Sequence, residues 1–108
     1  CRKQLNVLVR EKMGDMNAAG ISIETVNSAR RKVVDCLEDK SMTRKQLMNL
    51  LVAAIYEASH EELVGVGGFR RVGEKFSERQ LEKIFGVTRK TTRKWRKRLP
   101  NRINNFYL

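Results

Sequence analysis

A stretch in the middle of the chain, residues 47–58 with the sequence LMNLLVAAIYEA, is apolar on nearly every side of a helix. Thr43 is suited to cap the start of this helix, which we expect to run to about Ser59. A helix that is apolar on all faces has to be buried on all faces, because an exposed face would leave apolar surface in water. We therefore expect the remaining helices to pack around this one, whose alanines let neighbours approach closely.

Apolar residues also recur at helical intervals in the first third of the chain. We predict one helix over residues 2–16 and a second that Ser22 caps and that runs to about Glu38, with short breaks at residues 17–20 and 39–42. The residues expected to face the core are Leu5, Leu8, Val9, Met13 and Met16 in the first helix, and Ile23, Val26, Ala29, Val33, Cys36 and Leu37 in the second.

Residues 77–99, SERQLEKIFGVTRKTTRKWRKRL, predict two short helices joined by a tight turn. Ser77 and Gln80 form a capping box at the first helix, and Thr88 is placed to cap the second. Gly86 stands where the backbone has to turn left-handed, which glycine does without steric cost. A helix, a glycine turn and a basic second helix form the arrangement that places side chains in the DNA major groove.

The second of these helices is predicted to have one buried side and a basic remainder. Thr92, Trp95 and Leu99 fall on the side expected to face the core, and no acidic residue follows Glu82 in the chain. Glu82 occupies a position where many helix-turn-helix units carry alanine, so we expect either a looser helix pair or an ion pair of Glu82 with a basic residue. The alternative interpretation is an ordinary helical hairpin with a solvated basic face.

The net charge of +11 is unevenly distributed. Residues 61–108 hold 13 basic and five acidic residues, whereas residues 1–60 hold ten and seven. A clustered basic excess of this kind is typical of proteins that bind a polyanion, most often nucleic acid. A membrane surface is a weaker alternative because the basic stretch lacks a broad apolar face, and no apolar run approaches the roughly 20 residues of a membrane helix.

The two cysteines, Cys1 and Cys36, indicate neither a disulfide framework nor a metal site, so we expect a reduced, intracellular protein without cofactor or metal. A chain that begins with cysteine instead of methionine is expected to be a piece of a longer or processed protein. An enzyme is not expected either, since His60 is the only histidine and its place at a helix end favours a capping role.

Residues 61–76 are rich in glycine and too long for a tight connection, which predicts a mobile loop or a loose hairpin. Its glycines match neither a P-loop nor a dinucleotide-binding pattern. Arg70 and Arg71 in this segment could contact a nucleic-acid backbone, and a plain linker is the alternative.

Three segments together resemble the second cyclin-box repeat of the transcription factor IIB family, archaeal transcription factor B included. They are SIETVNSARRKVVDCLEDKSM, LMNLLVAAIYEAS and SERQLEKIFGVTRKTTRKWRKRL, and the resemblance covers about residues 22–99. It implies an all-α, cyclin-like orthogonal bundle of five helices with a buried third helix and a C-terminal helix-turn-helix. We expect one domain over residues 1–108, in which Pro100 ends the last helix and the tail 100–108 folds back through its apolar residues Ile103, Phe106 and Tyr107.

The resemblance also implies a function, which is contact with the promoter element just upstream of the TATA box, made with the TATA-binding protein and RNA polymerase as partners. The base-reading positions of the family fall on Lys90 and Arg93. Other expected DNA contacts are Thr88, Arg89, Thr91, Lys94 and Lys97, with further phosphate contacts from Arg70, Arg71, Arg79 and Arg96. Such a protein would be a monomer, in the nucleus of a eukaryote or in the cytoplasm or nucleoid of an archaeal or viral system.

The chain departs from the family in three ways. Lys90 is charged where an apolar residue is frequent, the link at Gly65–Gly73 is long, and only one repeat is present without a zinc ribbon. Two other functions therefore stay open. One is a stand-alone helix-turn-helix regulator, for which a viral origin is open and which would usually be dimeric, and the other is a cyclin-box module that binds a partner protein.

Overall fold

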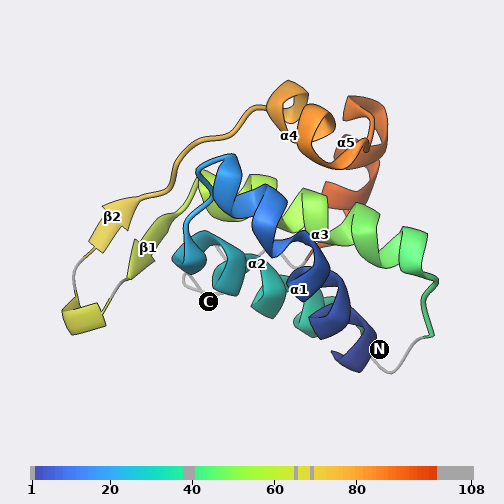
Figure 1. The fold of residues 1–108 in the computed structure, drawn as a ribbon, viewed down its shortest axis with the longest axis horizontal. Coiled ribbons are helices and arrows are strands. Elements are labelled where there is room, and N and C mark those ends of the chain that lie inside the picture. Colours follow the sequence, from blue (N-terminus) through green and yellow to red (C-terminus); the bar gives the residue numbers. More distant parts are fainter. Residues whose placement is uncertain (1, 38–40, 65, 69, 100–108) are drawn as a thin grey trace.

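The computed structural model describes residues 2–37, 41–64, 66–68 and 70–99, without the side chains of residues 63, 64, 66, 71 and 72. This part of the chain is mainly helical, as predicted (Figure 1). Its elements are α1 (Arg2–Ala18), α2 (Ile23–Leu37), α3 (Arg44–Ser59), β1 (Glu62–Val64), a 3-10 turn (Val66–Gly68), β2 (Arg70–Val72), α4 (Glu78–Phe85) and α5 (Arg89–Arg96). The predicted end of α2 at Glu38 and the tail 100–108 lie outside the described residues.

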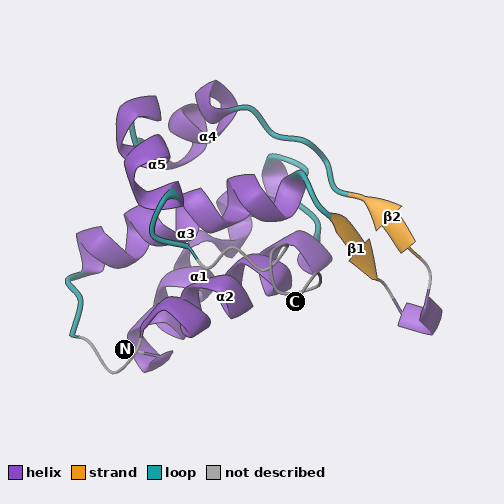
Figure 2. Cartoon of the chain, turned by 180° about the vertical axis from the view of Figure 1, so that it is seen from behind, coloured by secondary structure: helices purple, strands orange, loops and turns teal. Residues whose placement is uncertain are grey.

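Helix α3 runs through the middle of the molecule and contacts all four other α-helices. Helices α1 and α2 lie on one side of it and α4 and α5 on the other, as both views show (Figures 1 and 2). Thr43 and Gln46 form a reciprocal capping box at its start. The buried residues of α3 occupy every side of the helix, which confirms that it is the central element: Leu47, Leu50, Leu51, Val52, Ala53, Ala54, Ile55, Ala58 and Ser59.

Helices α1 and α2 bury the faces that their periodicity predicts, with one exception. Ser22 caps α2 by accepting a hydrogen bond from the Thr25 amide at 3.2 Å. Ile23, predicted to face the core, is instead 55% exposed. The prediction was wrong because Ile23 lies on the same side of the helix as Asn27 and Arg30, four and seven residues later, which are also exposed.

The glycine-rich segment forms a hairpin, which was one of its two predicted states. Strands β1 and β2 pair in antiparallel fashion with Leu63 opposite Arg71. The turn between them contains Gly67 and Gly68 at φ values of 83° and 81°, a conformation that glycine adopts without strain. The hairpin projects from the helical body near the end of α3, at the opposite end of the molecule from α5 (Figure 1).

The base of the hairpin is packed tightly against the last turn of α3. The Gly73 amide donates to the Glu61 carbonyl at 2.9 Å, and the Lys75 amide donates to the Ser59 carbonyl at 2.8 Å. The Phe76 amide donates to the Ser59 hydroxyl at 3.1 Å. A Cβ atom on Gly73 would lie 2.5 Å from the Ser59 carbonyl oxygen, so only glycine allows this approach.

Glu74 joins the same segment to the start of α2. Its Oε1 accepts from the Ser22 amide at 2.6 Å, and its Oε2 accepts from the Thr25 hydroxyl at 2.7 Å. Burial acts to raise the pKa of Glu74, but the hydrogen bonds from Ser22 and Thr25 outweigh it and hold the pKa below its ordinary value. The carboxylate also lies at a helix N-terminus, where negative charge is favoured.

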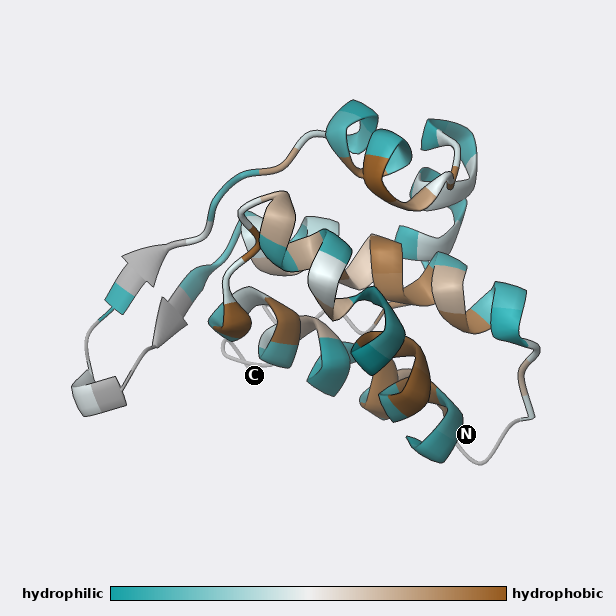
Figure 3. Ribbon diagram, in the orientation of Figure 1, coloured by the Kyte–Doolittle hydropathy of each residue, from teal (hydrophilic) through white to brown (hydrophobic). Residues whose placement is uncertain are grey.

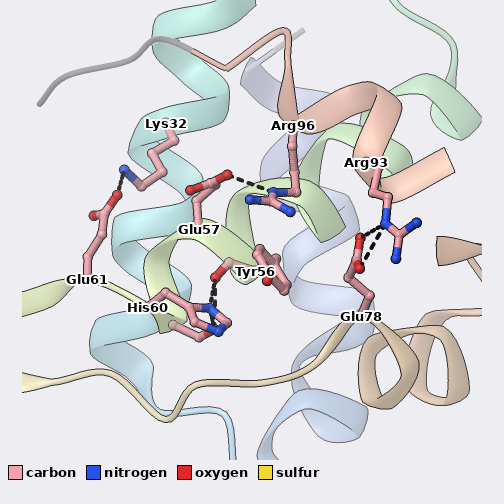
Figure 4. A network of polar contacts seen from close by, with 9 residues as sticks. Lys32, Tyr56, Glu57, His60, Glu61, Glu78, Arg93 and Arg96 are labelled. Atoms are coloured by element: carbon pink, nitrogen blue, oxygen red, sulfur yellow. Dashed lines mark hydrogen bonds and ion pairs between the residues drawn. The ribbon is translucent and has the colours of Figure 1, made fainter. Parts of the chain in front are cut away.

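A second link between the hairpin and α2 is an ion pair. The Lys32 ammonium group meets the Glu61 carboxylate next to β1, and the Lys32 side chain is only 9% exposed (Figure 4). A buried ammonium group needs such a partner, because it would otherwise lose its hydration without compensation. Polar contacts thus join the hairpin and the segment that follows it to both α2 and the end of α3.

Replacement of Gly73 by alanine is expected to lower the free energy of unfolding by about 1–3 kcal/mol, because the new methyl group must displace backbone. Gly14 provides the matched control, since it lies within α1 and a Cβ atom added there would have no other group within 4 Å. Gly14→Ala should raise the free energy of unfolding by about 0.5–1 kcal/mol through helix propensity. Chemical denaturation measures both, and equal effects would contradict the close packing at Gly73.

Glu74 should make the fold sensitive to acid. Since its pKa is lower in the folded than in the unfolded chain, its stabilising contribution is present above the unfolded pKa, about 4.3, and is lost as the pH falls through the folded value. Urea unfolding should therefore show Glu74→Gln less stable than wild type at pH 7, with a difference that narrows below about pH 4. Asp15→Asn, at an exposed carboxylate on α1, is the control, and a difference independent of pH would contradict this role of Glu74.

Candidate nucleic-acid interface

The two short helices and the glycine turn predicted for residues 77–99 are present, and their capping signals act as expected. The Gln80 amide donates to the Ser77 hydroxyl at 3.1 Å, and the Ser77 amide donates to the Gln80 side chain at 2.8 Å. Gly86 adopts the left-handed conformation at φ 73° and closes α4 with a 2.7 Å hydrogen bond to the Glu82 carbonyl. Thr88 then caps α5 by accepting from the Thr91 amide at 3.2 Å.

Helix α5 is anchored by two side chains that face the core. Thr92 is fully buried and Trp95 is 6% exposed, while Val87 of the turn is 7% exposed. The Arg98 guanidinium covers the outer face of the Trp95 ring, 4.2 Å from its centroid. The prediction that Trp95 belongs to the core is therefore confirmed, and its ring is not free to stack on a base.

Arg96, predicted as a phosphate contact, faces the protein. Its Nε donates to Glu57 Oε1 at 2.7 Å, and its guanidinium lies 4.1 Å from the centroid of the Tyr56 ring (Figure 4). Tyr56 in turn stacks on His60, whose Nδ1 lies 2.8 Å from the Tyr56 carbonyl oxygen at the end of α3. Arg96 thus joins α5 to α3, and His60 has the helix-end position expected for a capping residue.

Two ion pairs join α4 to α5. Arg93 Nε donates to both oxygens of Glu78, at 3.0 and 3.1 Å. Arg89 Nε lies 4.0 Å from Glu82 Oε1. This confirms that Glu82, which stands where many helix-turn-helix units carry alanine, pairs with a basic residue. Both arginines are more than half exposed and lie on the edge of α5 that faces α4.

The outer side of α5 carries lysines. Lys90, Lys94 and Lys97 are exposed and spaced three and four residues apart, so they share one side of the helix, opposite Thr92 and Trp95. No carboxylate pairs with these three lysines among the described residues. Figure 3 shows the outer turns of α4 and α5 as hydrophilic, and Arg79 is exposed on α4 while Thr91 is half-buried beside the turn.

A groove of about 630 Å³ lies beside this surface, between the start of α3 and the turn. Arg44 and Lys45 of α3, both exposed, line it together with Thr88 and Thr91 of α5. Sequence reasoning missed these two basic residues. A signal was available in the sequence. Two cations in the first turn of a helix interact unfavourably with the helix dipole, which suggests that they serve to bind an anion. Arg44 also pairs with Glu11 of α1.

The structure does not bring the hairpin arginines together with α5. Arg70 is exposed on β2, where it lies 3.7 Å from Glu62, and the hairpin is at the other end of the molecule (Figure 1). The side chain of Arg71 is outside the described part of the chain. DNA contacts of both residues stay predictions, and a contact at Arg70 would require a duplex that extends well beyond α5.

The described residues contain no group of three or more His, Cys, Asp or Glu side chains that could hold a metal ion. Within the same part of the chain, no helix is long and apolar enough to cross a membrane. Comparisons with protein-family models, with curated proteins and with solved structures yield no match to this chain.

The hydroxyl of Thr92 is buried and has no hydrogen-bond partner among the described residues. Because a buried hydroxyl without a partner costs free energy, Thr92→Val should leave the free energy of unfolding unchanged or raise it by about 1 kcal/mol. Thr25 is the matched control, since it is equally buried but donates to Glu74. Thr25→Val should lower the free energy of unfolding by about 1–3 kcal/mol in the same denaturation experiment. Similar losses of unfolding free energy in both variants would contradict the conclusion that the Thr92 hydroxyl makes no hydrogen bond.

Proposed function

We propose that this chain is a double-stranded DNA-binding domain that places α5 in the major groove. The proposal rests on one observation above all. Buried Thr92 and Trp95 fix one side of α5 to α3, while the opposite side presents Lys90, Lys94 and Lys97 without carboxylate partners among the described residues. A rigidly held basic helix that follows a capped glycine turn is the geometry of a recognition helix.

The groups around α5 divide into two kinds of contact. The lysines carry unpaired charge on flexible stems, which suits phosphate contacts that position a duplex without reading its sequence. Arg93 is held by α4, and arginine is the side chain that most often reads guanine. Arg44, Lys45 and the N-terminus of α5 around Thr88 would add phosphate contacts along the groove beside the turn.

The order of the helices supports a more specific proposal. A buried central third helix, two helices before it and a helix-turn-helix after it agree with a cyclin-like bundle of the transcription factor IIB type. On this proposal the chain contacts promoter DNA as a monomer, beside a TATA-binding protein and RNA polymerase, and acts by binding instead of catalysis. A stand-alone regulator would use the same surface but bind without the TATA-binding protein.

One observation favours a second candidate function, the binding of a partner protein. A groove of about 380 Å³ lies between α1 and the start of α3, and it is lined mainly by apolar surface of Val7, Leu8 and Leu47. Val7 is 49% exposed there. On this interpretation the basic α5 would be a solvated face, and the chain would bind no duplex at low salt.

Binding to a random duplex pool over a range of salt concentrations tests the proposal. Lys90→Ala/Lys94→Ala should bind at least about tenfold more weakly than wild type at low salt, and its slope of log affinity against log salt should be less steep by about two. Arg30→Ala/Arg31→Ala is the matched control, because these exposed arginines lie on α2, on the far side of α3 from α5 (Figure 2). Equal losses in both variants would mean that binding depends on net charge alone.

A second arm of this experiment adds a TATA-binding protein and a duplex that contains a TATA box. Tighter, sequence-enriched binding only with that protein supports the initiation-factor proposal. Enrichment without it supports a stand-alone regulator. A wild-type chain that binds no duplex at low salt contradicts both and favours the protein-binding function.

A further inference from the structure

The ion pair between Glu78 and Arg93 has an unusual distribution of exposure. The Glu78 side chain is only 14% exposed, whereas that of Arg93 is 63% exposed. Both carboxylate oxygens accept from the same nitrogen, Nε, at 3.0 and 3.1 Å. Glu78 accepts from Nε and not from the terminal nitrogens of Arg93, and Figure 4 draws both contacts at Nε.

We propose that Glu78 is a positioning residue for DNA recognition, which fixes Arg93 so that its terminal nitrogens meet the major-groove edge of a guanine. This inference rests on the proposed DNA-binding function and adds to it the base that is read and the residue that determines the selectivity. Arg93 would touch the base, and Glu78 would act only through Arg93.

The two terminal nitrogens of Arg93 form the free edge of its guanidinium group, and the chemistry of this edge decides which base Arg93 selects. A guanidinium group whose Nε is occupied offers its two terminal nitrogens as a pair of donors. Guanine presents two acceptors in the major groove, O6 and N7, whereas adenine presents the N7 acceptor beside an N6 donor. The fixed edge of Arg93 therefore matches guanine and meets an unmatched donor on adenine.

Glu78 is itself well placed to hold the arginine. It is the first residue of α4, directly after the cap Ser77, where the helix dipole favours a carboxylate. An arginine that is already ordered loses less side-chain entropy when it binds a base, so more of the contact energy appears as affinity. An unrestrained arginine could turn to a phosphate on any sequence and would discriminate less.

The negative charge of Glu78 distinguishes positioning from simple attraction. A carboxylate beside the DNA opposes phosphate binding, so its removal should strengthen non-specific binding while it weakens selectivity. If Glu78 served only to join α4 to α5, its replacement would change the stability of the fold and leave selectivity unchanged. Selectivity is therefore the quantity that tests the proposal.

The test uses duplexes selected by the wild-type chain and measures selectivity as the affinity ratio between the best site and the same site with a guanine replaced by adenine. Glu78→Gln is expected to lower this ratio about fivefold or more, within the roughly 5- to 150-fold range of one bidentate base contact. Its affinity for random duplex should stay the same or rise. Glu82→Gln is the matched control, because it removes the same charge from α4 but acts on Arg89 at 4.0 Å.

Arg93→Lys keeps the charge but cannot present two fixed donors, so it should lose the same selectivity. In an Arg93→Lys background, Glu78→Gln should have no further effect on the ratio, because the two residues act as one unit. Thermal unfolding of each variant shows whether Glu78→Gln weakens the fold. If it does, Arg93→Lys still tests the proposal, because it leaves Glu78 in place.

The outcomes separate this inference from the function on which it rests. A wild-type chain that binds no duplex at low salt overturns both. A chain that binds duplexes but selects no guanine, or equal losses of selectivity in Glu78→Gln and Glu82→Gln, overturns the role of Glu78 alone. Loss of selectivity in Glu78→Gln and Arg93→Lys but not in Glu82→Gln is the result that we expect.

Discussion

The burial of α3 on every side is the constraint on which the rest of this structure depends. Its apolar surface is covered by α1 and α2 on one side and by α4 and α5 on the other. The last of these contacts bears on function, because α5 is basic and has little apolar surface beyond Trp95 with which to hold its place. Buried Thr92 and Trp95, with the ion pair of Arg96 and Glu57, turn a marginal eight-residue helix into a fixed one.

The segment between the hairpin and α4 satisfies polar groups that would otherwise be left without partners. Residues 73–76 supply an amide to each of three acceptors near the end of α3, and Glu74 accepts from two donors at the start of α2. These contacts determine where the chain leaves the body, and hence where α4 begins. The glycine-rich segment is therefore part of the scaffold that positions α4 and α5, although its hairpin lies far from α5.

The cations of α5, together with Lys97 at its C-terminal cap, fall into two groups with different physical roles. Arg93 and Arg96 donate hydrogen bonds to carboxylates of α4 and α3, which hold their guanidinium groups, and Arg89 lies 4.0 Å from Glu82 of α4. Lys90, Lys94 and Lys97 face outwards with their full charge available. Paired arginines suit directional contacts, and unpaired lysines suit the salt-dependent attraction of phosphates. A count of basic residues alone would treat the six as equivalent.

The sequence by itself determined the features that depend on neighbours along the chain: the central helix 47–58, the caps at Thr43, Ser77 and Thr88, the left-handed Gly86 and the inward face of α5. Helical periodicity and capping act within a few residues, which is why they can be read without the fold. Only the tertiary structure decided the partners of charged side chains, because Arg93 and Glu78 are 15 residues apart, Arg96 and Glu57 are 39 apart, and Glu74 reaches Thr25 across 49. The sequence therefore predicted where the basic helix lies, and the packing of α4 and α3 against it decided which of its cations are held and which are free.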